Sequence, residues 1–188
     1  MKTDDELIAA YEAGEEPAFA ELLDRYLDAV YSFALRLTGS KEEAEDVAQE
    51  TFLKAWKNLK RFRTGANFKT WLLAIARNTA IDALRKKKPM SFRDFSRRED
   101  DDDFEHGIPD TAPTAGALFD AQLSVERIDR ALAGLAPMYR EVILLHYREE
   151  LTLDEAARIL KVPLNTLKSR DRRALIMLKK LLEPREGE

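Results

Sequence analysis

The stretch LTLDEAARILKVPLNTLKSRDRRALIM, residues Leu151–Met177, carries the clearest fold signal in the sequence. Thr152 followed by Glu155 matches the capping-box pattern and predicts the start of a short helix that ends near Leu160. The tripeptide KVP then predicts a tight turn, because Pro163 suits the first turn of a new helix. Two short helices around such a turn indicate a helix-turn-helix, whose second helix enters the major groove of DNA.

The second helix of this pair carries a polar and cationic face. Arginine and asparagine pair with base edges, whereas lysine, serine and threonine bind phosphates or bases. We expect contacts to duplex DNA from Asn165, Thr166, Lys168, Ser169, Arg170, Arg172 and Arg173. A surface helix that merely happens to be cationic is the alternative. Beyond these residues, Leu175 and Ile176 form a second apolar face, which we interpret as a surface for a protein partner.

Two residues conflict with this arrangement. Lys161 occupies the turn, where a positive φ would strain any residue other than glycine. Asp171 lies on the apolar stripe of the second helix, where an unpaired buried carboxylate is unfavourable. We therefore expect Asp171 to reach water, to pair with an arginine such as Arg158, or to disturb the packing.

Aromatic and cationic side chains alternate in a second segment, NLKRFRTGANFKTWLLAIARNTAIDALRKKK, at residues 58–88. Single-stranded nucleic acid is bound by such combinations, because bases stack on aromatic faces while cations follow the phosphates. The residues concerned are Arg61, Phe62, Arg63, Phe68 and Trp71. Ordinary core packing of the three aromatic side chains is the alternative.

Helical patterns dominate the chain outside residues 90–119, where the periodicity fails, and no strand pattern of any length occurs. Pro17, Gly39, Ser40, Asn67 and Pro89 mark the ends of the N-terminal helices. The predicted fold is all-α: an N-terminal helical bundle (1–89), a flexible acidic linker (90–122), and a C-terminal four-helix domain with the helix-turn-helix (123–183). Residues 99–126 include nine acidic residues and no basic one, and the linker has few aliphatic residues, so it cannot bury enough surface to fold alone.

Composition argues against several classes of protein. The chain lacks cysteine, and neither His106 nor His146 has a second histidine nearby at a ligand spacing. Glycine-rich phosphate loops and nucleophile elbows are also missing. We expect no enzyme activity, no cofactor and no metal site. The acidic N-terminus and the short apolar runs predict a cytoplasmic protein without membrane insertion.

Two long matches support a resemblance to a known family. LAPMYREVILLHYREELTLDEAARIL, together with the helix-turn-helix that follows it, resembles the promoter-reading C-terminal domain of bacterial sigma factors. AEDVAQETFLKAWKNLKRFRTGANFKTWLLAIARNTAIDALRKKK, residues 44–88, resembles the polymerase-docking and promoter-melting region of extracytoplasmic-function (ECF) sigma factors. The resemblance implies a sigma factor that directs promoter-specific initiation, with a C-terminal domain on the −35 element and an N-terminal domain on the melted −10 strand.

The resemblance also implies roles for particular residues and partners. The residues expected on the polymerase clamp are Asp46, Gln49, Glu50 and Leu53. Residues 61–71, including Asn67, would form the pocket for a flipped-out base, and one side of the next helix would hold the promoter through Arg77, Asn78, Asp82, Arg85 and Lys86. Core RNA polymerase, promoter DNA and an anti-sigma factor are the implied partners.

Other functions stay open on the sequence. A stand-alone helix-turn-helix regulator would bind duplex DNA tightly without polymerase, and a purely protein-binding helical module would need no DNA. The acidic linker would enter a positively charged channel of the polymerase, fold back on the basic faces to inhibit the free protein, or act only as a solvated spacer.

Overall fold

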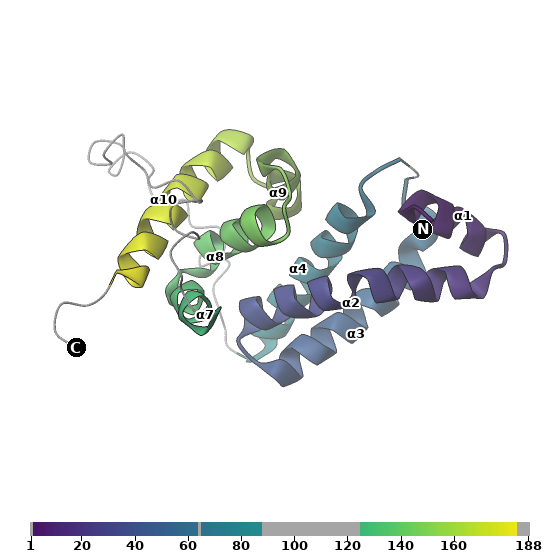
Figure 1. The fold of residues 1–188 in the computed structure, drawn as a ribbon, viewed down its shortest axis with the longest axis horizontal. Coiled ribbons are helices and arrows are strands. Elements are labelled where there is room, and N and C mark those ends of the chain that lie inside the picture. The colour runs from purple at the N-terminus through teal and green to yellow at the C-terminus, as the bar shows by residue number, and fades with distance from the viewer. Residues whose placement is uncertain (1, 64, 88–124, 184–188) are drawn as a thin grey trace. The chain divides into compact units, whose positions relative to one another are not determined.

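The structure, a computed structural model, describes residues 2–63, 65–87 and 125–183 (Figure 1). The chain divides between Lys87 and Lys88 into two compact units. Every regular element of the described residues is a helix, which confirms the all-α prediction. The predicted linker at 90–122, with His106 in it, lies outside the described residues.

The N-terminal unit begins with a helix that the hydrophobic pattern did not predict, α1 (Asp4–Glu12). Its start is a capping box. The Thr3 hydroxyl accepts the backbone N–H of Glu6 at 3.3 Å, and the Glu6 carboxylate accepts the backbone N–H of Thr3 at 2.7 Å. Leu7 and Ile8 are buried, so α1 is anchored by only two large apolar side chains, too few to give a clear period in the sequence.

The next two helices start and stop where the sequence signals predict. Helix α2 (Glu16–Thr38) has Pro17 in its first turn and ends at Gly39, whose φ of 77° suits glycine. Helix α3 (Lys41–Asn58) begins at Ser40, whose hydroxyl accepts the backbone N–H of Glu43 at 3.4 Å. A single 3₁₀ turn, η1 (Leu59–Arg61), continues from α3.

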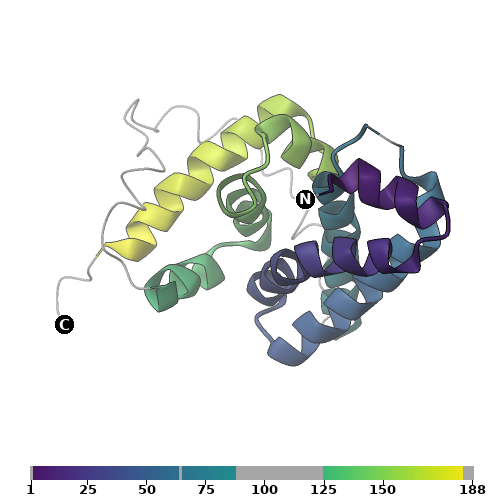
Figure 2. The ribbon, with the colours of Figure 1, turned by 45° about the vertical axis from the view of Figure 1, so that its right-hand side comes forward.

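Helix α4 (Phe68–Lys87) completes the unit. Asn67 caps it as predicted, because its side-chain oxygen accepts the backbone N–H of Thr70 at 3.0 Å. Helices α2, α3 and α4 lie side by side, and α1 packs on α2 (Figures 1 and 2). Large side chains of α2 and α4 fill the core, and small residues of α3 and α4 allow the helices to approach closely. Core members include Leu22, Val30, Phe33, Ala44, Ala55, Leu72, Leu73, Ala76 and Ala80.

The C-terminal unit is built along one long helix, α10 (Leu164–Leu182), which contacts each of the other α-helices of the unit (Figure 2). These are α7 (Val125–Gly134), α8 (Pro137–Ile143) and α9 (Leu153–Leu160). The Arg127 guanidinium donates to the backbone carbonyl of Leu182 at 2.6 Å, which satisfies a carbonyl at the end of α10. Buried members of the core include Leu132, Met138, Val142, Leu145, Leu160, Leu167, Ala174 and Leu178.

Helix α8 continues into a π-helical stretch, η2 (Leu144–Arg148). The wider turn is closed by the Glu149 N–H, which donates to the Leu144 carbonyl at 2.9 Å. A ring nitrogen of His146 lies 2.6 Å from the Leu151 carbonyl and so ties the stretch to the segment that leads into α9. Because π-helical turns carry no simple sequence pattern, the sequence predicted only a continuous helix here.

The turn between α9 and α10 has the positive φ at Lys161 that the sequence analysis considered. Thr152 and Glu155 form the predicted capping box at the start of α9. At its end, Lys161 has φ 56° and ψ 42°, the left-handed conformation, and its N–H donates to the Ala157 carbonyl. For a residue with a Cβ, this left-handed backbone conformation is less favourable than the right-handed one by roughly 1 kcal/mol.

We predict that Lys161→Gly stabilises the C-terminal unit by about 0.5–1 kcal/mol, because glycine adopts the left-handed conformation without this strain. Native-state hydrogen exchange at the amides of Ala174 and Leu178 measures the change in the full chain. Lys180→Gly, in the right-handed part of α10, is the matched control and should destabilise by a similar amount. Slower exchange in both variants, or in neither, would contradict the assignment of strain to Lys161.

Candidate nucleic-acid interfaces

The first turns of α10 present a polar face at the surface of the C-terminal unit. Asn165, Lys168 and Ser169 are exposed, and Thr166 is half-buried. The Ser169 hydroxyl donates to the Asn165 carbonyl one turn earlier, at 3.1 Å, so it is already oriented along the helix. These residues have the donors and acceptors that base edges and phosphates require.

The three arginines of α10 are less accessible than the sequence pattern predicted. Arg170 is only 7% exposed and lies in the interior of the unit, so its assignment to the DNA-contacting face is corrected. Arg172 and Arg173 are half-buried, and all three interact with other parts of the protein. The helical period placed Arg170 with Thr166 and Arg173, but the width of the buried side of α10 was not visible in the sequence.

Asp171 finds a partner that the sequence did not suggest. The Tyr147 hydroxyl, from η2, donates to Asp171 Oδ2 at 3.1 Å, while Oδ1 is buried and has no hydrogen-bond partner. Arg158, which the sequence analysis considered as one possible partner, pairs instead with Asp154 at 3.2 Å. Burial raises the pKa of Asp171, and the Tyr147 hydrogen bond and the nearby His146 offset this only in part.

The apolar pair after the arginines is divided between interior and surface. Leu175 is 6% exposed and belongs to the core of the unit, which corrects its assignment to a partner surface. Ile176 is half-buried and keeps part of its side chain accessible. Of the predicted pair, only Ile176 could therefore contribute to a partner surface.

In the N-terminal unit, the predicted aromatic residues form a single cluster at the start of α4. The ring of Phe62 lies 5.4 Å from that of Phe68 and 5.3 Å from that of Trp71, and Phe68 lies 5.5 Å from Trp71. Tyr26 of α2 joins the cluster through Phe68, at 5.5 Å. Such spacings are typical of favourable aromatic packing.

The members of this cluster differ in exposure. Phe68 is 2% exposed, so it is a core residue that supports the cluster and not a surface on which a base could stack. This corrects its place in the base pocket and bears out the alternative of core packing for Phe68. Phe62 and Trp71 are half-buried and keep part of their rings accessible.

Cationic and polar groups surround the cluster and continue along α4. Arg61 and Arg63 are exposed on the approach to it, and Asn67 is exposed although its side-chain oxygen caps α4. Farther along α4, three residues are exposed and two are half-buried. The exposed residues are Asn78, Asp82 and Lys86, and the half-buried ones are Arg77 and Arg85. From Phe68 to Lys86 the helix rises about 27 Å, enough for several nucleotides.

Helix α3 carries a separate exposed stripe. Asp46, Gln49, Glu50 and Leu53 are all exposed. The Glu50 carboxylate pairs with Lys54 at 2.8 Å, and the Lys54 hydrogen bond lowers the pKa of Glu50.

Trp56 extends this stripe by one turn and was missed in the sequence analysis. Its side chain is 50% exposed, and its indole N–H donates to the Tyr11 hydroxyl of α1 at 2.7 Å. Tyr11 and Trp56 line an open groove of about 910 Å³ between α1, the start of α2 and the end of α3. The three- and four-residue steps from Asp46 to Leu53 continue to Trp56, so the period itself contained the signal.

Other kinds of site are not evident in the described parts of the chain. Within residues 2–63, 65–87 and 125–183, no three His, Cys, Asp or Glu side chains gather in a way that could hold a metal ion. No helix in these ranges is long and apolar enough to cross a membrane.

Comparisons with known proteins match both units. Residues 22–89 match the Sigma-70 region 2 family, and residues 125–178 match the Sigma-70 region 4 family. The chain is 37% identical to the ECF RNA polymerase sigma factor SigW of Bacillus subtilis, over 90% of this chain and 91% of that protein. It is 32% identical to the ECF sigma factor RpoE of Cereibacter sphaeroides, over 88% and 86%.

Solved structures agree with these matches. The sigma factor RpoE of Bartonella quintana, solved with the anti-sigma factor NepR, has a TM-score of 0.67 at 29% identity and covers 87% of this chain and 96% of that one. CnrH, solved with the cytosolic domain of CnrY, has a TM-score of 0.68 at 25% identity and covers 95% and 96%.

We predict that Asp171→Asn stabilises the C-terminal unit by about 1 kcal/mol at pH 7.5, because a neutral amide is easier to bury than a carboxylate. The raised pKa means that the folded state binds the proton of Asp171 more tightly than the unfolded state does. The stability gained by Asp171→Asn over wild type should therefore be complete above that raised pKa and fade as the pH falls through it toward 3.8. Denaturant unfolding of the full chain, followed by NMR signals of α10, measures the effect.

Asp154→Asn is the matched control, since this carboxylate pairs with Arg158 at the surface and should change stability by at most about 0.5 kcal/mol. Equal stability of wild type and Asp171→Asn at pH 7.5 would contradict the prediction.

Proposed function

This chain belongs to the ECF sigma factors of bacterial RNA polymerase, and we propose which of its residues carry out the steps of initiation. It is a polymerase-associated sigma factor and not a stand-alone helix-turn-helix regulator. We assign residues 1–89 to polymerase docking and the −10 element, residues 90–122 to an acidic linker, and residues 123–183 to the −35 element.

In the C-terminal domain we assign duplex recognition to the exposed start of α10. Asn165 and Ser169 would contact base edges, and Lys168 would neutralise a phosphate. Their exposure on one face of the second helix of a helix-turn-helix supports this assignment. Arg172 and Arg173 would contribute through the accessible ends of their side chains, because long cationic side chains can bury the stem and present the head.

In the N-terminal domain we assign capture of the melted −10 strand to the cluster at the start of α4 and to the polar side of α4. A flipped base would stack against the accessible parts of Phe62 and Trp71, while Arg61 and Arg63 follow the backbone. Asn78, Asp82 and Lys86 would hold the strand farther along the helix. The observation that carries this function is the joint occurrence of a half-exposed aromatic cluster and a cationic approach to it.

We assign polymerase docking to the α3 stripe of Asp46, Gln49, Glu50 and Leu53, extended by Trp56. Large exposed apolar side chains are unfavourable in water, and two of them flanked by charged residues are typical of a protein-binding surface.

We further propose that an anti-sigma factor binds this chain, as the structure solved for RpoE of Bartonella quintana with the anti-sigma factor NepR suggests. The family acts as a transcription initiation factor, and we propose that the chain itself has no enzyme activity and works in the cytoplasm.

If the C-terminal domain binds duplex DNA and the N-terminal domain captures the opened strand, variants in the two domains should have different defects. In a holoenzyme with core polymerase, Asn165→Ala and Lys168→Ala should each weaken binding to a double-stranded −35 fragment by about 1–3 kcal/mol. Lys168→Ala should also reduce the slope of log affinity against log salt concentration by about 1, as expected for the loss of one phosphate contact. Combined Arg61→Ala and Arg63→Ala should leave duplex binding intact and reduce promoter opening. The fragment comes from promoters selected by transcription of a genomic library with the wild-type holoenzyme.

Fluorescence anisotropy on the duplex and permanganate reactivity of the opened strand are the two measurements. Lys180→Ala, an exposed lysine at the far end of α10, is the control and should behave as wild type. If the wild-type holoenzyme starts no transcripts, the proposed function fails altogether. Equal defects of all variants in both assays would contradict the division between the domains.

Docking through α3 predicts that truncation of its exposed apolar side chains weakens polymerase binding, whereas truncation of an equally exposed side chain on α2 does not. Leu53→Ala and Trp56→Ala should each weaken the affinity for core polymerase about tenfold or more, as central apolar residues of interfaces do. Leu27→Ala, on α2, is the matched control because Leu27 and Leu53 are both 48% exposed. Titration of labelled sigma factor with core enzyme measures the affinities. A loss with Leu27→Ala equal to that with Leu53→Ala would place the docking surface elsewhere.

A further inference from the structure

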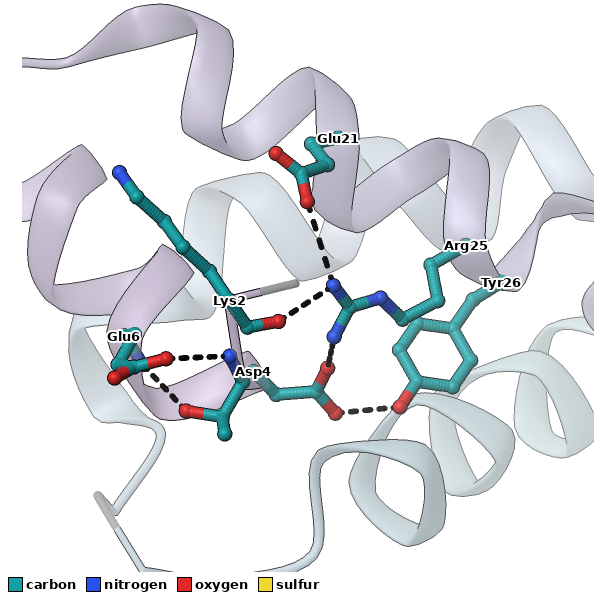
Figure 3. Close-up of polar contacts among 7 residues, drawn as sticks. Lys2, Asp4, Glu6, Glu21, Arg25 and Tyr26 are labelled. Atoms are coloured by element: carbon teal, nitrogen blue, oxygen red, sulfur yellow. Dashed lines mark hydrogen bonds and ion pairs between the residues drawn. The ribbon is translucent and has the colours of Figure 1, made fainter.

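The N-terminal helix α1 is joined to α2 by a compact polar network (Figure 3). Asp4 receives hydrogen bonds from two residues of α2. The Arg25 guanidinium donates to Oδ1 at 2.6 Å, and the Tyr26 hydroxyl donates to Oδ2 at 2.5 Å. Arg25 also donates to the Lys2 carbonyl at 2.8 Å and to Glu21 at 3.5 Å. Both oxygens of the Asp4 carboxylate are thus used to orient side chains of α2.

This network is partly shielded from water. The side chains of Asp4 and Arg25 are each 24% exposed, and Tyr26 is half-buried. Burial and the nearby Asp4 raise the pKa of Tyr26 above its usual range, so the hydroxyl stays protonated and continues to donate at physiological pH. A hydrogen bond to a charged acceptor in such surroundings is stronger and more directional than one at the surface.

The same tyrosine ring touches the aromatic cluster. Tyr26 packs against Phe68 at 5.5 Å, and Phe68 packs against both Phe62 and Trp71. A swing of the Tyr26 side chain about its Cα–Cβ bond would therefore open space beside Phe68 and loosen the two rings that keep an accessible surface. The Asp4 hydrogen bond opposes this swing because it holds the hydroxyl end of the ring.

A second contact joins α1 to the loop that approaches the cluster. Asp5 Oδ1 accepts the backbone N–H of Gly65 at 3.4 Å, a long bond between exposed groups. Gly65 has φ 85°, so the loop turns at this residue in a conformation that favours glycine. Helix α1 is thus linked to the cluster indirectly, through Asp4 and Tyr26, and to the loop before α4 through Asp5.

We infer that Asp4 and Tyr26 are positioning residues for the base pocket, and that α1 sets how tightly the domain holds the separated strand. This inference rests on the proposed capture of the −10 strand at Phe62 and Trp71. Neither residue touches the strand itself. They act by keeping Phe68 in place. The rings of Phe62 and Trp71 are then already positioned for a base, and fewer side chains have to become ordered when it binds.

The test uses full-length protein assembled with core polymerase. The probe is a fluorescent single-stranded oligonucleotide, selected from a random pool by the wild-type holoenzyme. Tyr26→Phe keeps the ring and removes only the hydroxyl, and Asp4→Ala removes its acceptor. Each should weaken strand binding about threefold to tenfold, mainly through faster dissociation. Affinity for core polymerase and for the −35 duplex should stay unchanged.

Two controls separate positioning from general stability. Tyr31→Phe makes the same change elsewhere on α2 and should bind the strand as wild type does. Val47→Ala truncates a fully buried side chain of α3 and should lower the unfolding temperature at least as much as Tyr26→Phe does, without the loss of strand affinity. In the double variant Asp4→Ala/Tyr26→Phe, the loss should not exceed that of the larger single variant, because both changes break the same bond.

Each outcome decides the matter. Wild-type strand affinity in Tyr26→Phe and Asp4→Ala overturns the inference and leaves the proposed function standing. A loss in Val47→Ala equal to that in Tyr26→Phe also overturns it, because strand binding would then follow stability alone. If the wild-type holoenzyme selects no strand from the pool, the proposed capture of the −10 strand fails and the inference fails with it.

Discussion

The burial of Phe68 is the constraint on which the N-terminal unit depends. This residue is the first of α4, and its ring is enclosed by side chains from α2, from the loop before α4 and from the next turn of α4. The burial of Phe68 completes the core between the helices. The same ring contacts place Phe62 and Trp71 next to each other at the surface. Stability and the candidate binding surface therefore share one residue. A fully buried phenylalanine contributes roughly 1.5–3 kcal/mol, a substantial part of the stability of a small domain.

The sequence predicted the fold class and most helix ends, because those ends are set by local chemistry. Ser40, Asn67, Thr152 and Gly39 act through neighbours within a few residues, and such interactions leave direct patterns in the sequence. Helix α1 was missed because only Leu7 and Ile8 anchor it strongly. Its capping box at Thr3 was the available signal.

The candidate sites were predicted less well, because burial depends on residues far away in the chain. Nothing near Arg170 or Leu175 indicated that the rest of the domain would cover them. The partner of Asp171 likewise depends on tertiary structure, since Tyr147 comes from a preceding element, whereas Arg158, one of the possibilities considered, pairs with an acid one turn away on its own helix. Patterns of residue type indicated the candidate interfaces, and only packing distinguished the residues that face solvent from those that are buried beneath them.

The π-helical stretch η2 has a consequence for how this domain can vary. A π-helical turn holds one residue more than an ordinary helical turn, and successive helical residues differ in direction by about 100°. Loss of a single residue here would restore regular α-helical geometry and turn Tyr147 away from Asp171. It would also move the ring of His146 away from the Leu151 carbonyl, just before α9. Both the length and the composition of this segment are therefore constrained: Leu144 and Leu145 are buried, His146 and Tyr147 form hydrogen bonds, and a deletion would misalign these contacts.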